Sequence, residues 1–136
     1  MHEAVPSNLP TPPAPLNWAV KAPSDCQILY TAHLSFDESG AFVDGTIKEQ
    51  TRRTMDNIKA SVEAAGGTMA DITQCLIYLV DAADAPGMNA VYAEYFDGVL
   101  PNRATVVVAA ILAPEAKVEI VAYAHIARKP LKRPRS

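Results

Sequence analysis

The pattern of apolar and polar residues predicts two helices, each with one face to bury. Thr46 and Glu49 have the spacing of a capping box, which starts a helix that two glycines at residues 66–67 end. Asp84 is placed to cap a second helix that stops at Gly98. The apolar stripes consist of Ile47, Thr51, Met55, Ile58 and Val62 in the first helix and of Met88, Val91, Tyr92, Tyr95 and Phe96 in the second.

Short apolar runs rich in β-branched residues predict the strands. The strongest runs are residues 26–36, 72–80, 106–112 and 118–126, with shorter candidates at 16–21 and 41–43. Residues 113–116, which include Pro114, are predicted to be the turn of a hairpin-like antiparallel pair formed by the last two long runs. Such a pair would bring Arg103 and Glu119 to the same end of the sheet.

Arg103, just before one of these apolar runs, and Glu119, within the next, are charged residues that suggest a substrate site, although each has a simpler interpretation. A guanidinium and a carboxylate held at one end of an apolar sheet would suit a small carboxylate substrate and a water molecule. Arg103 is also compatible with a solvated residue at the start of a strand, and Glu119 with a solvated position on the polar face of its strand. The spacing of the two residues does not by itself make them catalytic.

Strands that are apolar on both sides indicate how the layers assemble. Both helix stripes can cover one face of a single mixed sheet, which gives a two-layer α+β domain. Residues 72–80 and 106–112 are apolar on both of their faces, so the uncovered side of the sheet would expose a large apolar patch. We therefore expect a homo-oligomer whose sheets face one another.

Composition divides the chain of 136 residues into three parts. Residues 1–15 contain five of the eleven prolines and are expected to form an extended arm, residues 16–127 to form one domain, and residues 128–136 to form a basic, disordered tail. The tail has five of the twelve basic residues and no acid, so the net charge of −3 becomes −8 for the remainder, with seven basic and fifteen acidic residues. This acidic body argues against nucleic acid as a partner.

Neither a membrane nor a metal is expected from the sequence. No apolar run approaches the roughly 18 residues that cross a bilayer, and the N-terminus lacks the pattern of a secretory signal. Cys26 and Cys75 stand alone in apolar strands, which indicates free thiols in a reducing, cytoplasmic setting. The three histidines show no metal-ligand spacing.

Several stretches together resemble the RidA family, also called the YjgF or UK114-type family. The first runs from Glu49 to Phe96 and ends in the motif Asn-x-x-Tyr-x-x-Tyr-Phe. The others are residues 100–111, with the motif Pro-x-Arg-x-Thr, and residues 117–126, with Val-Glu-Ile. The resemblance covers residues 18–126 and implies a chorismate-mutase-like α+β fold, a homotrimer and clefts between its subunits.

The resemblance also implies an activity and a set of site residues. Members of the family hydrolyse reactive enamines and imines, such as 2-aminoacrylate, to 2-oxo acids and ammonia without a cofactor. On this resemblance, Arg103 binds the substrate carboxylate, and Glu119 orients and activates the attacking water. The backbone N–H of Thr105 helps to hold the carboxylate, and Asn89 lies at the pocket.

The sequence departs from the family pattern at the wall opposite the carboxylate. Leu16 stands where many members have a tyrosine, Trp18 lies close by, and Ala32-His33-Leu34 replaces a Ser-Gly-Gln segment. These changes favour a larger or more apolar enamine acid, or else a trimer that binds a small acid or a partner without turnover. His33 would have a proton role in the pocket or serve as a hydrogen-bonded structural residue. An RNA-directed activity is a third and weaker option, because the body is acidic.

Overall fold

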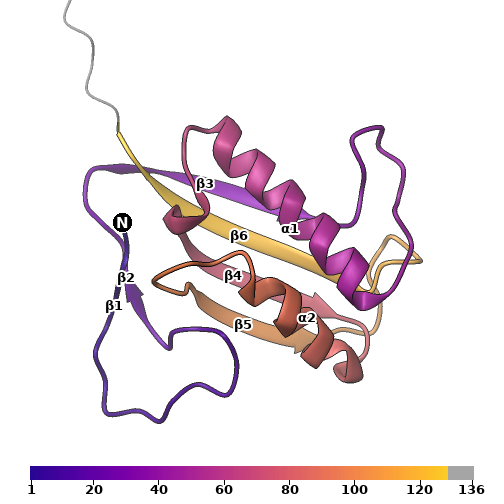
Figure 1. Cartoon of the computed structure of the whole chain (residues 1–136), viewed down its shortest axis with the longest axis horizontal. Coiled ribbons are helices and arrows are strands. Elements are labelled where there is room, and N and C mark those ends of the chain that lie inside the picture. Colours follow the sequence, from indigo (N-terminus) through magenta and orange to yellow (C-terminus); the bar gives the residue numbers. More distant parts are fainter. Residues whose placement is uncertain (129–136) are drawn as a thin grey trace, which may run out of the picture.

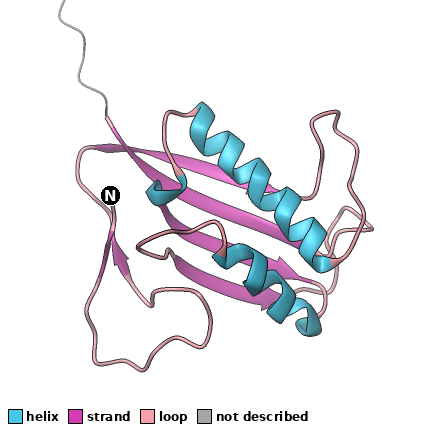
Figure 2. Ribbon diagram, in the orientation of Figure 1, coloured by secondary structure: helices cyan, strands magenta, loops and turns pink. Residues whose placement is uncertain are grey.

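A single sheet with both long helices on one face makes up most of the protein (Figures 1 and 2). The structure, a computed structural model, describes residues 1–128. The helices are α1 (Ile47–Ala64) and α2 (Ala85–Ala93), and the four strands of the sheet are β3 (Cys26–His33), β4 (Ile72–Leu79), β5 (Asn102–Val107) and β6 (Val118–Ala127). The predicted two-layer α+β architecture with a mixed sheet is confirmed.

The order of strands in the sheet is β3-β6-β4-β5, which differs from the predicted hairpin. β6 lies in the middle and is antiparallel to both β3 and β4, whereas β5 is parallel to β4 at the edge. The predicted pairing of residues 106–112 with 118–126 is therefore wrong. β5 ends at Val107, and the chain then passes beyond β4 before it enters β6. In the middle of the sheet, the ten-residue β6 gains a hydrogen-bonded partner on each side, which a hairpin at the edge would not give it.

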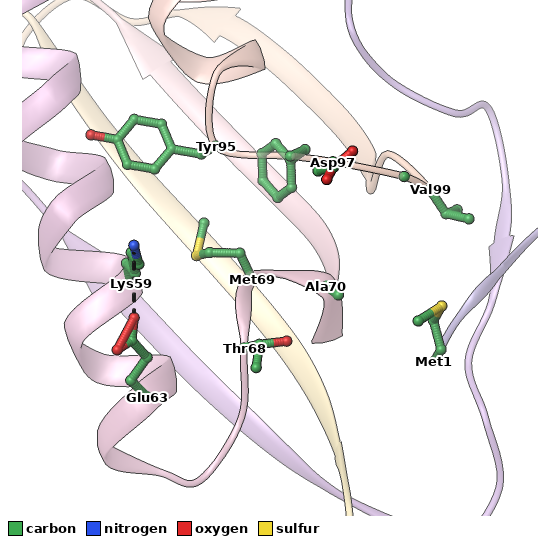
Figure 3. Close-up of a pocket in the computed structure, with 11 residues that line it drawn as sticks. Met1, Lys59, Glu63, Thr68, Met69, Ala70, Tyr95, Asp97 and Val99 are labelled. Atoms are coloured by element: carbon green, nitrogen blue, oxygen red, sulfur yellow. Dashed lines mark ion pairs between the residues drawn. The ribbon is translucent and has the colours of Figure 1, made fainter.

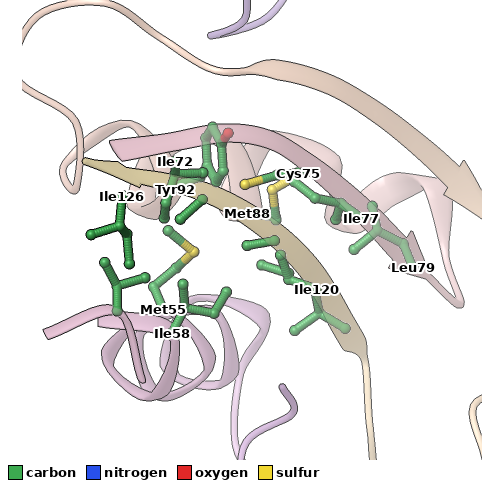
Figure 4. Close-up of a cluster of buried hydrophobic side chains, with 14 residues drawn as sticks. Met55, Ile58, Ile72, Cys75, Ile77, Leu79, Met88, Tyr92, Ile120 and Ile126 are labelled. Carbon is green, nitrogen blue, oxygen red and sulfur yellow. The ribbon is translucent and has the colours of Figure 1, made fainter. Parts of the chain in front are cut away.

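The core lies between the sheet and the helices (Figure 4). Along β6 every second side chain from Val118 to Ile126 is buried, and the side chains between them face away from the helices. The main buried side chains opposite β6 are Met55, Ile58 and Val62 of α1 and Met88 and Tyr92 of α2.

The predicted helix signals differ in how well they locate the helix ends. The capping box of α1 is present, with the Glu49 N–H donating to Thr46 Oγ1 at 3.2 Å. α2 is shorter than predicted, since it ends at Ala93 rather than continuing to Gly98. Asp84 makes no capping hydrogen bond; instead Asp81 Oδ1 accepts from the Ala83 N–H at 2.9 Å and caps a short 3₁₀ turn, Ala82–Asp84, that leads into α2.

The face of the sheet that points away from the helices is apolar, and no element within residues 1–128 covers it. Tyr30 is 69% exposed there and meets Tyr123 edge to face, with ring centroids 5.3 Å apart. Ile28 and Val106 are also exposed on this face. The exposed apolar side that the two-sided strands predicted is thus present.

The N-terminal segment lies beside the start of β5 (Figure 1). Strand β1 (Glu3–Ala4) pairs with β2 (Val20–Lys21), so the candidate strand at 16–21 is short and joins the arm rather than the main sheet. Between them, the Asn17 N–H donates to the Pro101 carbonyl at 3.1 Å. The predicted basic tail lies outside the described residues apart from Arg128. No helix within residues 1–128 is long and apolar enough to cross a membrane.

Gln50 connects α1 to the beginning of β6. Its side chain is fully buried, its Nε2 donates to the Glu115 carbonyl at 2.9 Å, and its Oε1 accepts from the Lys117 N–H at 2.8 Å. One amide thus satisfies two backbone groups just before the strand that carries Glu119.

Replacing Gln50 with Met preserves most of the side-chain volume but leaves both backbone groups without this partner. The free energy of unfolding should fall by about 2–4 kcal/mol, because each buried unsatisfied group costs about 1–3 kcal/mol. Urea unfolding at a fixed protein concentration measures the change. Gln27→Met, at an exposed position of β3, is the matched control. Equal losses in the two variants would show that the Gln50 amide does not hold this junction.

Candidate functional site

Arg103 lies under α2 on the helix-covered face of the sheet. On the neighbouring strand β4, its register partner is Cys75, whose side chain is buried in the core. The side chain of Arg103 therefore points to the same side of the sheet. The residue is 8% exposed, and its Cζ atom lies over the Tyr92 ring, 5.0 Å from the ring centroid. Arg103 is therefore a buried residue, not the solvated strand-entry residue that the sequence also allowed.

Several polar atoms around Arg103 have no hydrogen-bond partner. Within the described residues, Nε and Nη1 of Arg103 are buried and unpaired, as are the Tyr92 hydroxyl, Asn89 Oδ1 and Thr105 Oγ1. Thr105 follows Arg103 on the same side of β5, and Asn89 lies one helical turn before Tyr92. We call these four residues the Arg103 cluster. Buried polar groups are normally satisfied, so a group of unsatisfied ones indicates a binding site.

The positive charge of Arg103 has no counter-charge nearby. The ion pairs found among residues 1–128 do not include it. Burial raises the pKa of the Cys75 thiol to about 12, and burial also raises the pKa of the Tyr92 phenol, so both neighbours are neutral at physiological pH. Burial lowers the pKa of Arg103 itself, yet a guanidinium stays protonated. The cluster can therefore bind an anion, and a carboxylate fits the fork of N–H donors.

Glu119 lies on the opposite face of the sheet from Arg103. It pairs with Tyr78 on β4, and Tyr78 is three positions from Cys75, so the two side chains point to opposite sides. β4 also separates the two strands. Within one chain, the expectation that Arg103 and Glu119 meet at one end of the sheet is therefore wrong. Glu119 lines a cavity of about 410 Å³ with Leu34, Phe36 and residues 111–113.

The remaining predicted wall residues lie in different places. His33 is on β3, at the opposite edge of the sheet from Arg103, and its Nε2 is hydrogen-bonded to Ser61 Oγ at 2.7 Å. Trp18 faces a shallow hollow of about 380 Å³ with Gln74, Asn102 and His125. Leu16 is half-buried next to Asn17, at the start of β5.

The structure thus places Arg103 and Thr105 on one side of β5 and Asn89 one helical turn from the ring that contacts Arg103, whereas Glu119, His33 and Trp18 lie in other parts of the fold. Tyr92 contacts Arg103, although its spacing in the sequence predicted only a place in the apolar stripe of α2. The available signal was the Asn-x-x-Tyr spacing, which puts Asn89 and Tyr92 on one side of the helix.

One cavity lies away from every predicted site residue. It has about 480 Å³ and lies between the end of α1 and the segment after α2, with Met69 and Phe96 in its wall and a Lys59–Glu63 pair at 3.9 Å on one side (Figure 3). Among residues 1–128, no group of three or more histidine, cysteine, aspartate or glutamate side chains could hold a metal ion.

Known proteins with similar sequences show the family of the chain. The family model described as Endoribonuclease L-PSP matches residues 7–126. A RutC family protein from Pyrococcus horikoshii is 39% identical over 119 residues, which are 87% of this chain and 92% of the relative. The protein named 3-aminoacrylate deaminase RutC from Acinetobacter baylyi is 38% identical over 123 residues, 90% of this chain and 95% of the relative.

Solved structures share the fold. A crystal structure of YyfB from Yersinia pestis, of the conserved Rid protein family, has a TM-score of 0.83 at 23% identity and covers 92% of this chain and 98% of its own. RidA from an Antarctic Psychrobacter species has a TM-score of 0.68 at 32% identity, covering 86% and 93%. The protein is thus a small α+β domain of the Rid type. The chain belongs to the RidA, YjgF or UK114 family, as its motifs predicted.

The stability of the protein should depend on His33 at acid pH. Burial lowers the pKa of His33 from its ordinary value of 6.5, so the unfolded chain binds this proton more readily than the folded chain. The stability contributed by neutral His33 is present above about pH 6.5 and is lost as the pH falls through the lower, folded-state pKa. In His33→Gln, the free energy of unfolding should decline less between pH 7 and 5 than in the wild type. Parallel curves from urea unfolding would contradict this.

Removing the uncompensated charge of Arg103 should not weaken the ligand-free protein. We expect Arg103→Met to keep the free energy of unfolding or to raise it by about 1–2 kcal/mol. The substitution removes a buried charge and N–H donors that have no hydrogen-bond partner, so no hydrogen bond is lost. Added pyruvate should raise the melting temperature of the wild type but not of Arg103→Met. Arg52→Met, which breaks an exposed pair with Glu94 at 2.7 Å, is the control and should cost no more than about 1 kcal/mol. A larger loss at Arg103 than at Arg52 would reveal a hidden counter-charge.

Proposed function

We propose that the protein binds small 2-imino and enamine acids at the Arg103 cluster and hydrolyses them to 2-oxo acids and ammonia. The observation that carries this proposal is the buried, uncompensated guanidinium of Arg103. Such a group binds a carboxylate, which these substrates and products share. The relative named 3-aminoacrylate deaminase supports the reaction class.

The reaction needs a fixed carboxylate, an activated water and a site for the leaving amine. Water adds to the C=N carbon of the imine, and the resulting carbinolamine loses ammonia to leave the C=O of the 2-oxo acid; an enamine first takes a proton on carbon to become the imine. Arg103 holds the carboxylate. β5 is an edge strand, so its outward backbone N–H groups, including those near Thr105, can assist. Asn89 Oδ1 is an acceptor for the substrate N–H.

If Glu119 activates the water, it must come from a second subunit. A single chain places Arg103 and Glu119 on opposite faces of the sheet, so no side-chain movement within that chain joins them. The apolar outer face supports assembly into the homotrimer that the family resemblance implies, because a patch of this kind is normally covered. The proposed site is therefore a cleft between subunits.

A second candidate is a trimer that binds small acids or a partner without turning a substrate over. The separation of Glu119 from Arg103 favours it, because Arg103 alone suffices to bind a carboxylate but supplies no general base. An RNA-directed activity has less support. The body outside the tail carries a net charge of −8, and Arg103 is one buried guanidinium rather than a basic surface.

Turnover and subunit mixing together test both candidates. Wild-type protein should speed the release of 2-oxo acid from imines generated by an amino-acid oxidase or a threonine dehydratase, and both Arg103→Met and Glu119→Gln should lose at least about a hundredfold in kcat/KM. Mixed and reassembled at equal amounts, the two inactive variants should recover up to about a quarter of wild-type activity, since that fraction of random interfaces contains both native residues.

Each outcome decides between the candidates. No recovery on mixing, with reassembly verified by native mass spectrometry, would contradict a site shared between subunits. Pyruvate binding without turnover in the wild type would favour the acid-binding trimer. Activity of Arg103→Met equal to that of the wild type would remove both.

A further inference from the structure

Tyr92 is the aromatic side chain that contacts Arg103. It lies on α2, is fully buried and presents its ring to the guanidinium, with Cζ 5.0 Å from the ring centroid. Its hydroxyl has no hydrogen-bond partner within the described residues. The ring also meets Phe96 at a centroid distance of 4.8 Å in a tilted arrangement. Tyr92 is thus held by the core and is in contact with the charged group.

Arg103 has little else to fix its position. Arginine has a long and flexible side chain, and an ion pair or hydrogen bonds usually restrain its guanidinium. Here Nε and Nη1 have no partner, and the described residues supply no ion pair. The interaction that remains is cation–π attraction to the ring face, which strengthens when both groups are removed from water.

We propose that Tyr92 is the positioning residue of the site: its ring holds the guanidinium of Arg103 in place before the substrate carboxylate arrives. This inference rests on the proposed function and explains how the site binds the substrate carboxylate. A neutral aromatic ring is suited to this task, because a carboxylate in its place would neutralise Arg103 and compete with the substrate. Pre-organisation lowers the cost of ordering the side chain on binding, so it increases affinity without adding a contact to the ligand.

The ring and the hydroxyl make separable predictions. Tyr92→Phe retains the ring face that holds the guanidinium, so its Kd for pyruvate should rise much less than that of Tyr92→Leu. Tyr92→Leu retains an apolar side chain without a π face. Its Kd for pyruvate and its KM should rise by about tenfold, with a smaller change in kcat, in line with the loss of a partly desolvated cation–π contact.

Phe96→Leu is the matched control, because it removes the neighbouring aromatic ring but not the ring that faces Arg103. It should lower the melting temperature about as much as Tyr92→Leu and leave the Kd for pyruvate, measured by calorimetry, unchanged. In an Arg103→Met background, Tyr92→Leu should cause no further loss of kcat/KM, because its effect acts through the guanidinium.

The outcomes separate this inference from the proposed function. Equal weakening of pyruvate binding in Tyr92→Leu and Phe96→Leu would show a general packing effect and overturn the positioning role, even with turnover intact. Pyruvate binding weakened as much in Tyr92→Phe as in Tyr92→Leu would assign the role to the hydroxyl and also overturn it. If the wild type binds pyruvate but hydrolyses no imine, the proposed function fails, while the selective loss in Tyr92→Leu would still support the positioning role.

Discussion

The guanidinium of Arg103 is buried without an ion-pair partner among residues 1–128, and the rest of the site follows from this arrangement. Two of its nitrogen atoms are buried and unpaired, and its neighbours Cys75 and Tyr92 are both neutral. A buried and unpaired charge is unfavourable, so a protein retains one at a place where a ligand supplies the opposite charge. The protein surrounds the charge with a rigid core on one side and the open edge of β5 on the other. This gives an anion access to a donor that is already desolvated.

The position of β6 in the sheet determines which residues can take part in the chemistry. Side chains alternate along β6, and Val118 and Ile120 are buried against the helices, so Glu119 between them points to the face that the helices do not cover. The same face presents exposed Ile28, Tyr30 and Val106. A carboxylate surrounded by apolar groups that need a cover is well placed to meet another copy of the chain. The separation of Arg103 from Glu119 and the uncovered sheet thus lead to the same inference, a site completed by assembly.

Much of the fold could be predicted from local sequence patterns, and the errors arose where distant parts of the chain decide. The capping box at Thr46 located the start of α1, because it depends on residues three apart. The pairing of β5 with β6 was predicted wrongly, because adjacency in sequence favours a hairpin and nothing local reveals that β4 is the better neighbour. For the site, the motif resemblance singled out Arg103 and Asn89. The contact between Arg103 and Tyr92 could not be predicted. An aromatic residue in the apolar stripe of a helix is expected to be a core residue, and the sequence does not show which strand packs against it.

A crystal structure of the assembled protein with bound pyruvate tests the central claim most directly, since it shows what neutralises Arg103. We expect the pyruvate carboxylate to lie within hydrogen-bond distance of the Arg103 guanidinium, with the guanidinium still over the Tyr92 ring and the partner subunit's Glu119 facing the keto carbon. A protein carboxylate paired with Arg103, or pyruvate bound only at another place while the guanidinium remains unoccupied, would contradict it.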